Sequence, residues 1–220
     1  MKPDNQDRVT GISHKEELAN WLTHGIAILL SVAGAIWIFW SLVHLPQASV
    51  VKWISVSVYL SGMILLYSAS TLYHYVNNPR WKHVLRIIDH SAIYVKIAGT
   101  YTPFLVLAIP YVYGYGLLTL LWVMALAGIL FKVFFVNRYN TISTVIYLCM
   151  GWIAVLILLP LYNALALDAF IFILAGGFSF SLGVIFYLMK KLPYAHSIWH
   201  LFVMGGSAFH YASVYLFVVQ

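Results

Sequence analysis

Long apolar stretches separated by short polar segments make up most of the chain. Runs without Asp, Glu, Lys or Arg cover residues 18–51, 53–79, 97–131, 139–167, 169–189 and 192–220. Each run is at least as long as the roughly 20 residues that a helix needs to cross a bilayer. The pattern therefore predicts an all-α integral membrane protein.

Turn-forming residues divide these runs into seven predicted transmembrane helices. The run 97–131 contains Pro110, Gly114 and Gly116, which favour a turn between two helices. Pro46 separates the first two helices, and Asp168 marks the loop before the sixth. The predicted spans are 19–43, 49–75, 85–108, 115–136, 141–162, 166–189 and 194–218.

Composition agrees with this class of protein. Charged residues are 8% of the chain and hydrophobic residues 63%, whereas a soluble domain carries roughly 25% charged residues. The single cysteine, Cys149, excludes an internal disulfide. Residues 1–17 lack the apolar core and cleavage site of a signal peptide. We therefore expect 1–17 to be a cytoplasmic N-terminal segment and 18–220 to be the seven-helix membrane domain.

Lysine and arginine are distributed unequally between the two predicted sides of the membrane. Ten of the twelve lie on one side: Lys2, Arg8, Lys15, Arg80, Lys82, Arg86, Lys132, Arg138, Lys190 and Lys191. Lys52 is alone on the other side, and Lys96 falls within the third span. Because cytoplasmic loops are rich in Lys and Arg, we expect a cytoplasmic N-terminus and an extracytoplasmic C-terminus, the reverse of G-protein-coupled receptors. The basic loops are expected to meet anionic lipid headgroups, not nucleic acid.

Five polar residues stand out against the apolar background: Ser70, His74, Asp89, His196 and His200. Ionisable groups within a membrane are costly and usually mark a functional site. In the predicted topology these residues come from the second, third and seventh helices, and all five lie in the cytoplasmic half of the membrane. Their common depth predicts that they form one site.

The histidines have the spacing of metal ligands. His196 and His200 are four residues apart, on one helix face and about 6 Å apart in rise. Together with His74 they could provide three imidazoles, the donor set of catalytic zinc with a water as fourth ligand. The scarcity of thiolates and carboxylates favours Zn2+ over magnesium or calcium. A lone membrane histidine is more often an interhelical hydrogen-bonding residue, but the shared depth of the group favours a metal site.

A zinc ion at this site would make hydrolysis feasible, because it lowers the pKa of bound water to about 7 and polarises a carbonyl. Asp89 could hold or deprotonate that water. Ser70 could donate a hydrogen bond to the water or to a developing oxyanion. Asp89 and Ser70 are therefore the predicted catalytic residues.

Three further residues have no single assignment from the sequence. His24 could approach the site as a partner or simply cap or anchor the first helix. His210 lies about 15 Å beyond His200 along its helix, too far for the same metal, and is expected to bond between helices. Lys96 falls near the middle of the bilayer, where an unpaired ammonium is costly. A wet cavity that accepts a lipid headgroup would account for it.

The motifs together resemble those of the progestin and adiponectin receptor superfamily, which is linked with the alkaline ceramidases. The shared pattern is Ser-x3-His ending the second helix, Asp early in the third and His-x3-His opening the seventh. Bacterial hemolysin III-like proteins are more similar still. The resemblance rests on EELANWLTHG (16–25), SASTLYHYV (68–76), IIDHSAIYVKIAGTYTPF (87–104) and HSIWHLFVMGGSAFH (196–210). It covers nearly the whole chain.

This resemblance implies a seven-helix fold in which His74, His196 and His200 bind zinc, with Asp89 and Ser70 beside them. It also implies a multi-pass protein of the bacterial inner membrane whose partners are membrane lipids or a fatty-acyl substrate. The oligomeric state stays open.

Three functions are compatible with these observations. The leading one is a zinc-dependent hydrolase of a lipid amide or ester, involved in membrane-lipid homeostasis. The second is a receptor or membrane-state sensor with structural zinc and no turnover. The third, a pore-forming haemolytic protein, is least favoured, since one buried aspartate and one lysine do not make a charged channel lining.

Overall fold

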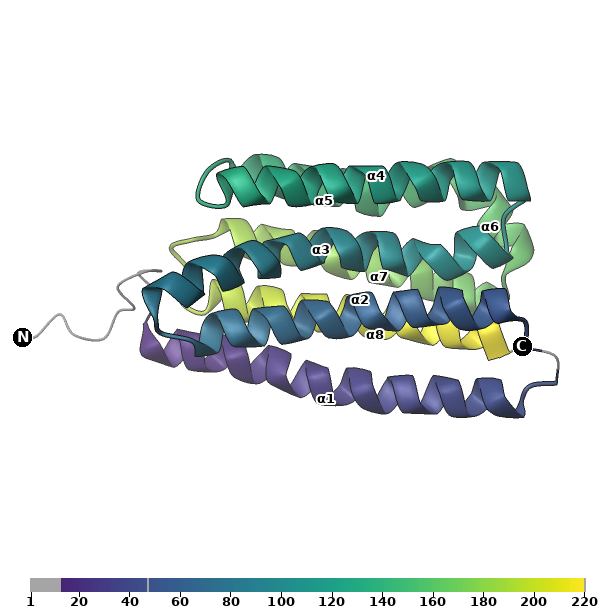
Figure 1. Ribbon diagram of the computed structural model, residues 1–220, viewed down its shortest axis with the longest axis horizontal. Helices are drawn as coiled ribbons and strands as arrows, with labels where there is room; N and C mark the ends of the chain where they lie inside the picture. Colours follow the sequence, from purple (N-terminus) through teal and green to yellow (C-terminus); the bar gives the residue numbers. More distant parts are fainter. Residues whose placement is uncertain (1–12, 47, 220) are drawn as a thin grey trace, which may run out of the picture.

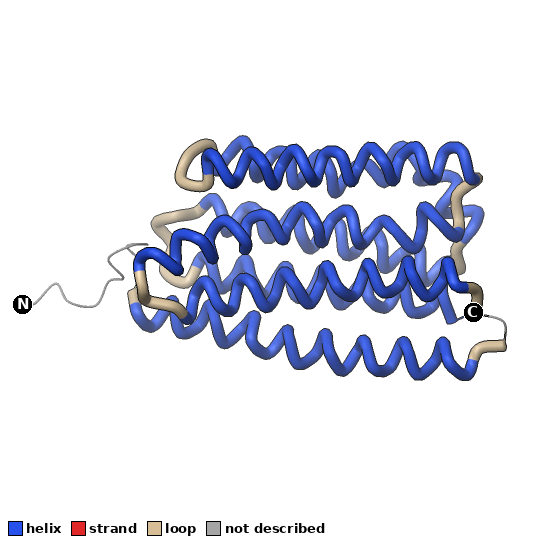
Figure 2. The backbone as a smooth tube through the Cα atoms, in the orientation of Figure 1, coloured by secondary structure: helices blue, strands red, loops and turns tan. Residues whose placement is uncertain are grey.

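A computed structural model describes residues 13–46 and 48–219, which form a bundle of long helices running side by side (Figure 1). The described part of the chain contains no strand (Figure 2), so the all-α prediction is confirmed. The helices are α1 (His14–His44), α2 (Val50–Tyr75), α3 (Pro79–Leu107), α4 (Tyr111–Phe135), α5 (Asn140–Trp152), the 3-10 helix η1 (Ile153–Ile157), α6 (Leu158–Ala164), α7 (Leu167–Leu188) and α8 (Ala195–Val219).

Six segments are long and apolar enough to cross a membrane, with Asn140–Ala164 counted as one of them. The remaining long helix, α3, has 29 residues. It carries five charged residues, namely Arg80, Lys82, Arg86, Asp89 and Lys96. It nevertheless lies within the bundle beside α2 (Figure 1). The start of α1 and the end of α8 lie at opposite ends of the bundle, as an odd number of passes requires.

Helix α1 begins at His14, earlier than the predicted start at residue 19. Ser13 caps it: the Ser13 hydroxyl accepts from the Glu16 backbone N–H at 3.3 Å, and the Glu16 carboxylate accepts from the Ser13 N–H at 3.1 Å. This reciprocal capping box sets the helix start independently of hydropathy. Of the predicted N-terminal segment, residues 1–12 lie outside the described residues, and the rest belongs to the cap and first turn of α1.

Helix α3 also starts earlier than predicted, at Pro79 rather than residue 85. The Asn78 side chain accepts from the backbone N–H of Arg80 at 3.1 Å, and proline occupies the first helical position. Both features favour a helix start. Asp89 therefore lies ten residues into the helix, not one turn as the predicted boundary implied. The first turns of α3 carry charged residues, so a prediction from apolar runs starts the helix too late.

The predicted fifth span is interrupted by the 3-10 segment η1. Pro160 cannot donate a backbone hydrogen bond to the carbonyl four residues earlier. At the beginning of the break, the Tyr101 hydroxyl from α3 donates to the Gly151 carbonyl at 2.5 Å and accepts from the Ala154 N–H at 2.8 Å. A side chain from another helix thus satisfies backbone groups that the interrupted helix leaves free, as buried membrane segments require.

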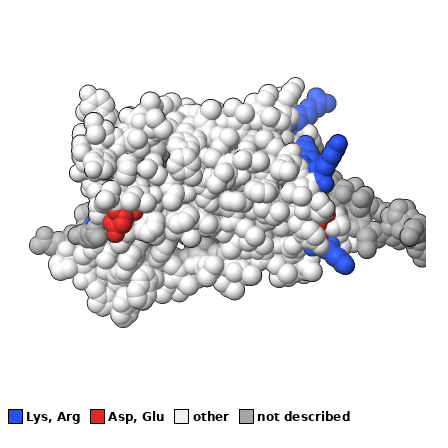
Figure 3. Space-filling view, turned by 180° about the vertical axis from the view of Figure 1, so that it is seen from behind, with Lys and Arg blue, Asp and Glu red and all other residues white. Residues whose placement is uncertain are grey.

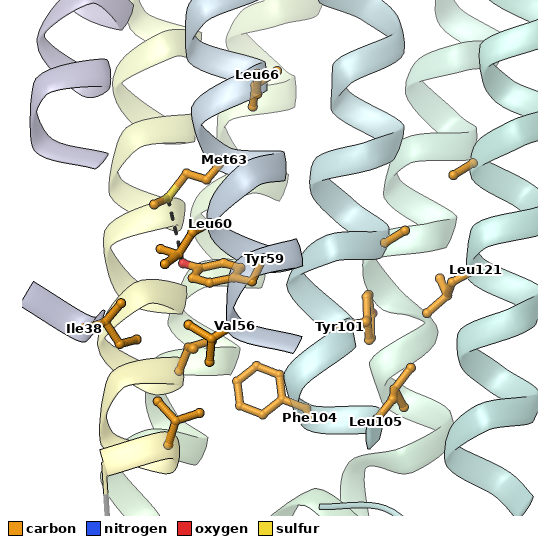
Figure 4. Close-up of a cluster of buried hydrophobic side chains, with 14 of the residues drawn as sticks. Ile38, Val56, Tyr59, Leu60, Met63, Leu66, Tyr101, Phe104, Leu105 and Leu121 are labelled. Atoms are coloured by element: carbon orange, nitrogen blue, oxygen red, sulfur yellow. Dashed lines mark hydrogen bonds between the residues drawn. The ribbon is translucent and has the colours of Figure 1, made fainter. Parts of the chain in front are cut away.

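Apolar side chains from α1, α2, α3 and α8 form the main core. Figure 4 shows Ile38, Val56, Tyr59 and Leu60 packed together, with Phe104 beside them. The opposite face of α1 is exposed and apolar, including Trp37 and Trp40 (58% and 63% exposed), as expected for a surface in contact with lipid.

Close packing of α2 against α3 depends on Gly62. A Cβ atom at this position would lie 3.3 Å from the backbone of Val95 and Lys96. We expect Gly62→Leu to destabilise the protein by about 1–3 kcal/mol, the usual cost of overpacking, measured as a lower Tm in detergent. Gly116→Leu is the matched control, because nothing lies within 4 Å of a Cβ there. Equal Tm values for both variants would show that this approach is not needed.

The charged side chains gather mainly at the ends of the bundle. Figure 3 shows Lys and Arg concentrated at the end where α1 begins, on the face in view. The start of α3, the α4–α5 connection and the α7–α8 connection bring them there. The long apolar sides between the two ends are the natural membrane-facing surface.

Candidate metal centre

Three histidines meet at the end of the bundle where α1 begins. His74 is the next-to-last residue of α2, and His196 and His200 lie in the first two turns of α8. One ligand atom from each lies within 4.8 Å of the other two. His74 and His200 are each 2% exposed, and His196 is partly buried. The predicted ligand residues are therefore brought together in a cluster that could hold a metal ion.

Glu17 orients the first of these imidazoles. The His74 Nδ1–H donates to Glu17 Oε2 at 2.5 Å. The other oxygen, Oε1, accepts from the ammonium of Lys82 at 3.0 Å. Glu17 and Lys82 are 5% and 0% exposed, so each charge has an opposite charge beside it in a region without bulk water. A carboxylate bound to the far nitrogen of a metal-binding histidine fixes the ring and increases its basicity.

His200 is oriented by a second residue of α1. Its Nδ1–H donates to the backbone carbonyl of Asn20 at 3.2 Å, and the Thr23 hydroxyl lies 3.1 Å from the same nitrogen. The Asn20 side chain in turn accepts from the Ser197 hydroxyl at 2.6 Å. Since a carbonyl can only accept, Nδ1 carries the proton and Nε2 keeps its lone pair.

One buried nitrogen gives a direct test of whether the residues fit a metal. His74 Nε2 is buried and has no hydrogen-bond partner among the described residues. Its Nδ1–H is committed to Glu17, so Nε2 is an unpaired acceptor, which is costly in a buried position. A metal ion bound by the three imidazoles would satisfy it. The donor set therefore fits a first-row metal.

Asp89 and Ser70, the predicted catalytic residues, line the same cavity as His196 and His200. The Asp89 carboxylate interacts with the Ser70 hydroxyl and, electrostatically, with His74 and Arg86. Asp89 is 8% exposed and Ser70 is 2% exposed. The structure thus brings together residues from α2, α3 and α8, as the sequence predicted, and their catalytic roles stay predictions.

His24 is a closer neighbour of the site than the sequence indicated. Its ring stacks on His200, with ring centres 3.6 Å apart and planes 13° from parallel, and it contacts Tyr67 edge-on at 5.0 Å. Both ring nitrogens are buried without a partner in the described part of the chain. Of the two alternatives for His24, the structure favours a partner of the site over a helix cap.

Two neighbours of the histidines, Glu17 and Asn20, were not predicted from the sequence, whereas His24 was a candidate partner of the site. Glu17, Asn20 and His24 all lie on the buried face of α1. Their spacing of three and four residues is that of one helix face. This regular polar face at the start of an apolar helix was the available signal.

Two of the three histidines, His196 and His200, open on an apolar cavity between α3, α5–α6, α7 and α8. About 170 Å³ of this cavity can be reached by the centre of a water-sized sphere. It extends from His196 past Lys96 to Tyr101 and Leu161. Its extended shape and apolar lining suit a hydrocarbon chain beside His196 and His200.

Comparison with known proteins identifies the family. The family model described as "Haemolysin-III related" matches residues 12–211. The chain belongs to the haemolysin-III related family. It is 44% identical to the hemolysin-3 homolog of Bacillus subtilis over 206 residues, covering 94% of this chain and 96% of that protein. It is also 44% identical to hemolysin-3 of Bacillus cereus, covering 93% of each chain.

A more distant relationship extends to animal proteins. The human monocyte to macrophage differentiation factor is 28% identical over 214 residues, covering 93% of this chain and 85% of that protein. The predicted resemblance is therefore confirmed, as is the location of this haemolysin-III family member as a multi-pass bacterial membrane protein.

Two polar residues of this family member lie deeper in the bundle than the histidine cluster. His210 Nε2–H donates to the Ile173 carbonyl of α7 at 3.2 Å, which confirms the predicted bond between helices. The Lys96 ammonium lies 3.8 Å from the centre of the Phe180 ring. Both residues line the cavity.

Proposed function

We propose that this chain is a membrane-embedded, zinc-dependent hydrolase that cleaves a fatty-acyl amide or ester and takes part in membrane-lipid homeostasis. The observation that carries the proposal is the meeting of three imidazoles beside an apolar cavity, which is lined by two of them, His196 and His200, and by Asp89. Such a cavity suits an acyl chain, and the imidazoles suit a metal beside the scissile carbonyl.

His74, His196 and His200 would hold the metal, and zinc suits three nitrogen donors with no thiolate among them. When bound, zinc would supply a Lewis acid for the carbonyl and a more acidic water. Glu17 and Asn20 keep two of the imidazoles in the orientation that leaves Nε2 available. The chain's own contribution is thus a pre-oriented donor set.

Asp89 would move the proton. In the proposed reaction its carboxylate accepts a proton from water as the water oxygen bonds to the acyl carbon. The acyl C–N or C–O bond then breaks, and Asp89 returns the proton to the leaving nitrogen or oxygen. Ser70 lies near this carboxylate and can donate to it or to the carbonyl oxygen. Apolar walls hold the acyl chain and limit bulk water.

A receptor or sensor with a structural metal is the second candidate, and one observation favours it. Contacts from Glu17 to His74 and from Asn20 to His200 tie α1 to α2 and α8. A metal at the histidines would join α2 to α8, and α1 would be held to both through Glu17 and Asn20. In that case the metal would govern stability, with no turnover.

One set of assays on purified protein separates the candidates. Zinc-loaded protein in detergent is incubated with lipid amides and esters, and released fatty acid is measured by mass spectrometry. The hydrolase proposal expects product that disappears when zinc is removed. A lower Tm without zinc and no product from any lipid would favour the structural metal instead. Dye leakage from protein-containing liposomes would favour the pore-forming alternative.

We further propose that α3 is a seventh span, and that the N-terminus is cytoplasmic and the C-terminus extracytoplasmic. The concentration of Lys and Arg at the end where α1 begins supports this orientation (Figure 3). The zinc site then lies beneath the cytoplasmic face, because His74 ends α2 and His196 opens α8.

Reporter fusions in a bacterial host test this topology. Alkaline phosphatase fused after Gln220 is expected to be active, and green fluorescent protein at the same position to be dark, because that end is extracytoplasmic. Fusions after Lys191, in the α7–α8 connection, serve as the control and should behave in the opposite way. A fluorescent C-terminal fusion with inactive phosphatase would refute the orientation.

A further inference from the structure

Lys96 places an ammonium group on the cavity wall, away from the three histidines. The residue is 5% exposed, and its Nζ lies 3.8 Å from the centre of the Phe180 ring. A cation–π contact stabilises a desolvated ammonium. An unpaired charge within a membrane is costly, and such residues are usually paired with another group. The aromatic contact alone does not neutralise the buried charge of the Lys96 ammonium. We therefore looked for an anionic partner.

No carboxylate of the described residues supplies that partner. Glu17 is bound by His74 and Lys82. Asp89 is on the same helix as Lys96 but seven residues earlier, about 10 Å along the axis, at the end of the cavity nearest the histidines. No ion pair with Lys96 is formed within residues 13–46 and 48–219. A ligand within the cavity is the remaining source of negative charge.

The surroundings of Lys96 limit what that ligand is. Ile97, Leu174 and Phe180 provide apolar walls. His210 is close enough to Lys96 to interact electrostatically, but it uses its Nε2–H on the Ile173 carbonyl. The site thus offers one cation in apolar surroundings. This suits an amphiphile with one small anionic group. A phospholipid headgroup would bring further polar groups into a region that cannot pair them.

We propose that Lys96 is the anion-binding residue of a fatty-acid site, with the carboxylate on its ammonium and the hydrocarbon chain along the apolar cavity walls. This binding site is separate from the histidine cluster and does not rest on hydrolysis. Because both face one cavity, a bound fatty acid would occupy space that a lipid substrate of the histidine site requires.

Binding of tritiated palmitate to full-length protein in detergent tests the proposal, with unlabelled palmitate and hexadecanol as competitors. In protein freed of metal by chelation, palmitate is expected to bind at least about tenfold more tightly than hexadecanol, because only the acid forms a charge-assisted hydrogen bond. Lys96→Met is expected to weaken palmitate binding by about tenfold or more and to leave hexadecanol binding within about threefold.

Lys132→Met is the matched control, because Lys132 is fully buried but does not line the cavity. It should leave palmitate affinity unchanged. If Lys96→Met does not fold, Lys96→Gln takes its place, and the comparison of acid with alcohol in the wild-type protein needs no variant. Equal affinity for acid and alcohol overturns the proposal. So does palmitate binding that vanishes with the metal, since the carboxylate would then sit at the histidines.

Discussion

His200→Ala is expected to weaken zinc binding by well over the roughly 10–100-fold that loss of an outer partner causes. The substitution removes one of the three histidine donors that lie within 4.8 Å of one another. It also removes the ring that Asn20 orients and on which His24 stacks. Affinity can be measured in detergent by competition with a chromogenic zinc indicator.

His44→Ala is the matched control for this variant, because His44 is exposed at the opposite end of α1. Its zinc affinity should equal that of the wild-type protein. Unchanged affinity in His200→Ala would remove the histidine cluster as the metal site.

Glu17→Gln is expected to weaken zinc binding less than His200→Ala does, because it changes the partner of a ligand and not a ligand itself. The amide can still accept from His74 but lacks the charge that pairs with Lys82. We expect zinc affinity to fall by about 10–100-fold. Glu16→Gln is the neighbouring control, since Glu16 binds the backbone of Tyr194 and not a histidine. Equal affinities for the two variants would show that Glu17 has no influence on the metal.

Asp89→Asn is expected to lower lipid hydrolysis by about 10²–10⁴-fold, the usual contribution of a general acid–base, while zinc remains bound. The amide keeps the size of the side chain but cannot accept the proton. Fatty-acid release and metal content are measured on the same sample, so that loss of turnover can be separated from loss of zinc.

Asp168→Asn is the control for this prediction, because Asp168 opens α7 and lies outside the cavity. It should retain full turnover. If Asp89→Asn keeps wild-type turnover, Asp89 is not the proton carrier, and the proposed reaction needs another base.

The helical class and the residues of the histidine cluster could be predicted from sequence for separate reasons. The six long apolar segments follow from runs long enough to cross a bilayer. The meeting of His74 with His196 and His200 follows from their position at helix ends on one side of the membrane. Successive helices run in opposite directions, and residues four apart share a helix face. These two rules place the three histidines near one another before any packing is known.

Contacts between helices could not be predicted in the same way. Glu17 and His74 are 57 residues apart in the chain, and their pairing depends on how α1 rotates against α2. Lys82 was counted among the loop cations, yet it is fully buried against Glu17. The break at η1 likewise depends on Tyr101 from another helix. Such features depend on packing rather than on periodicity.

Hydrolysis in water enriched in oxygen-18 tests the central claim most directly. Zinc-loaded wild-type protein is incubated with the lipid amides and esters, and the released fatty acid is analysed by mass spectrometry. The account predicts fatty acid whose carboxylate carries one oxygen from the labelled water, formed only when zinc is present. Absence of fatty acid from every lipid, or an equal rate with metal-free protein, would contradict it.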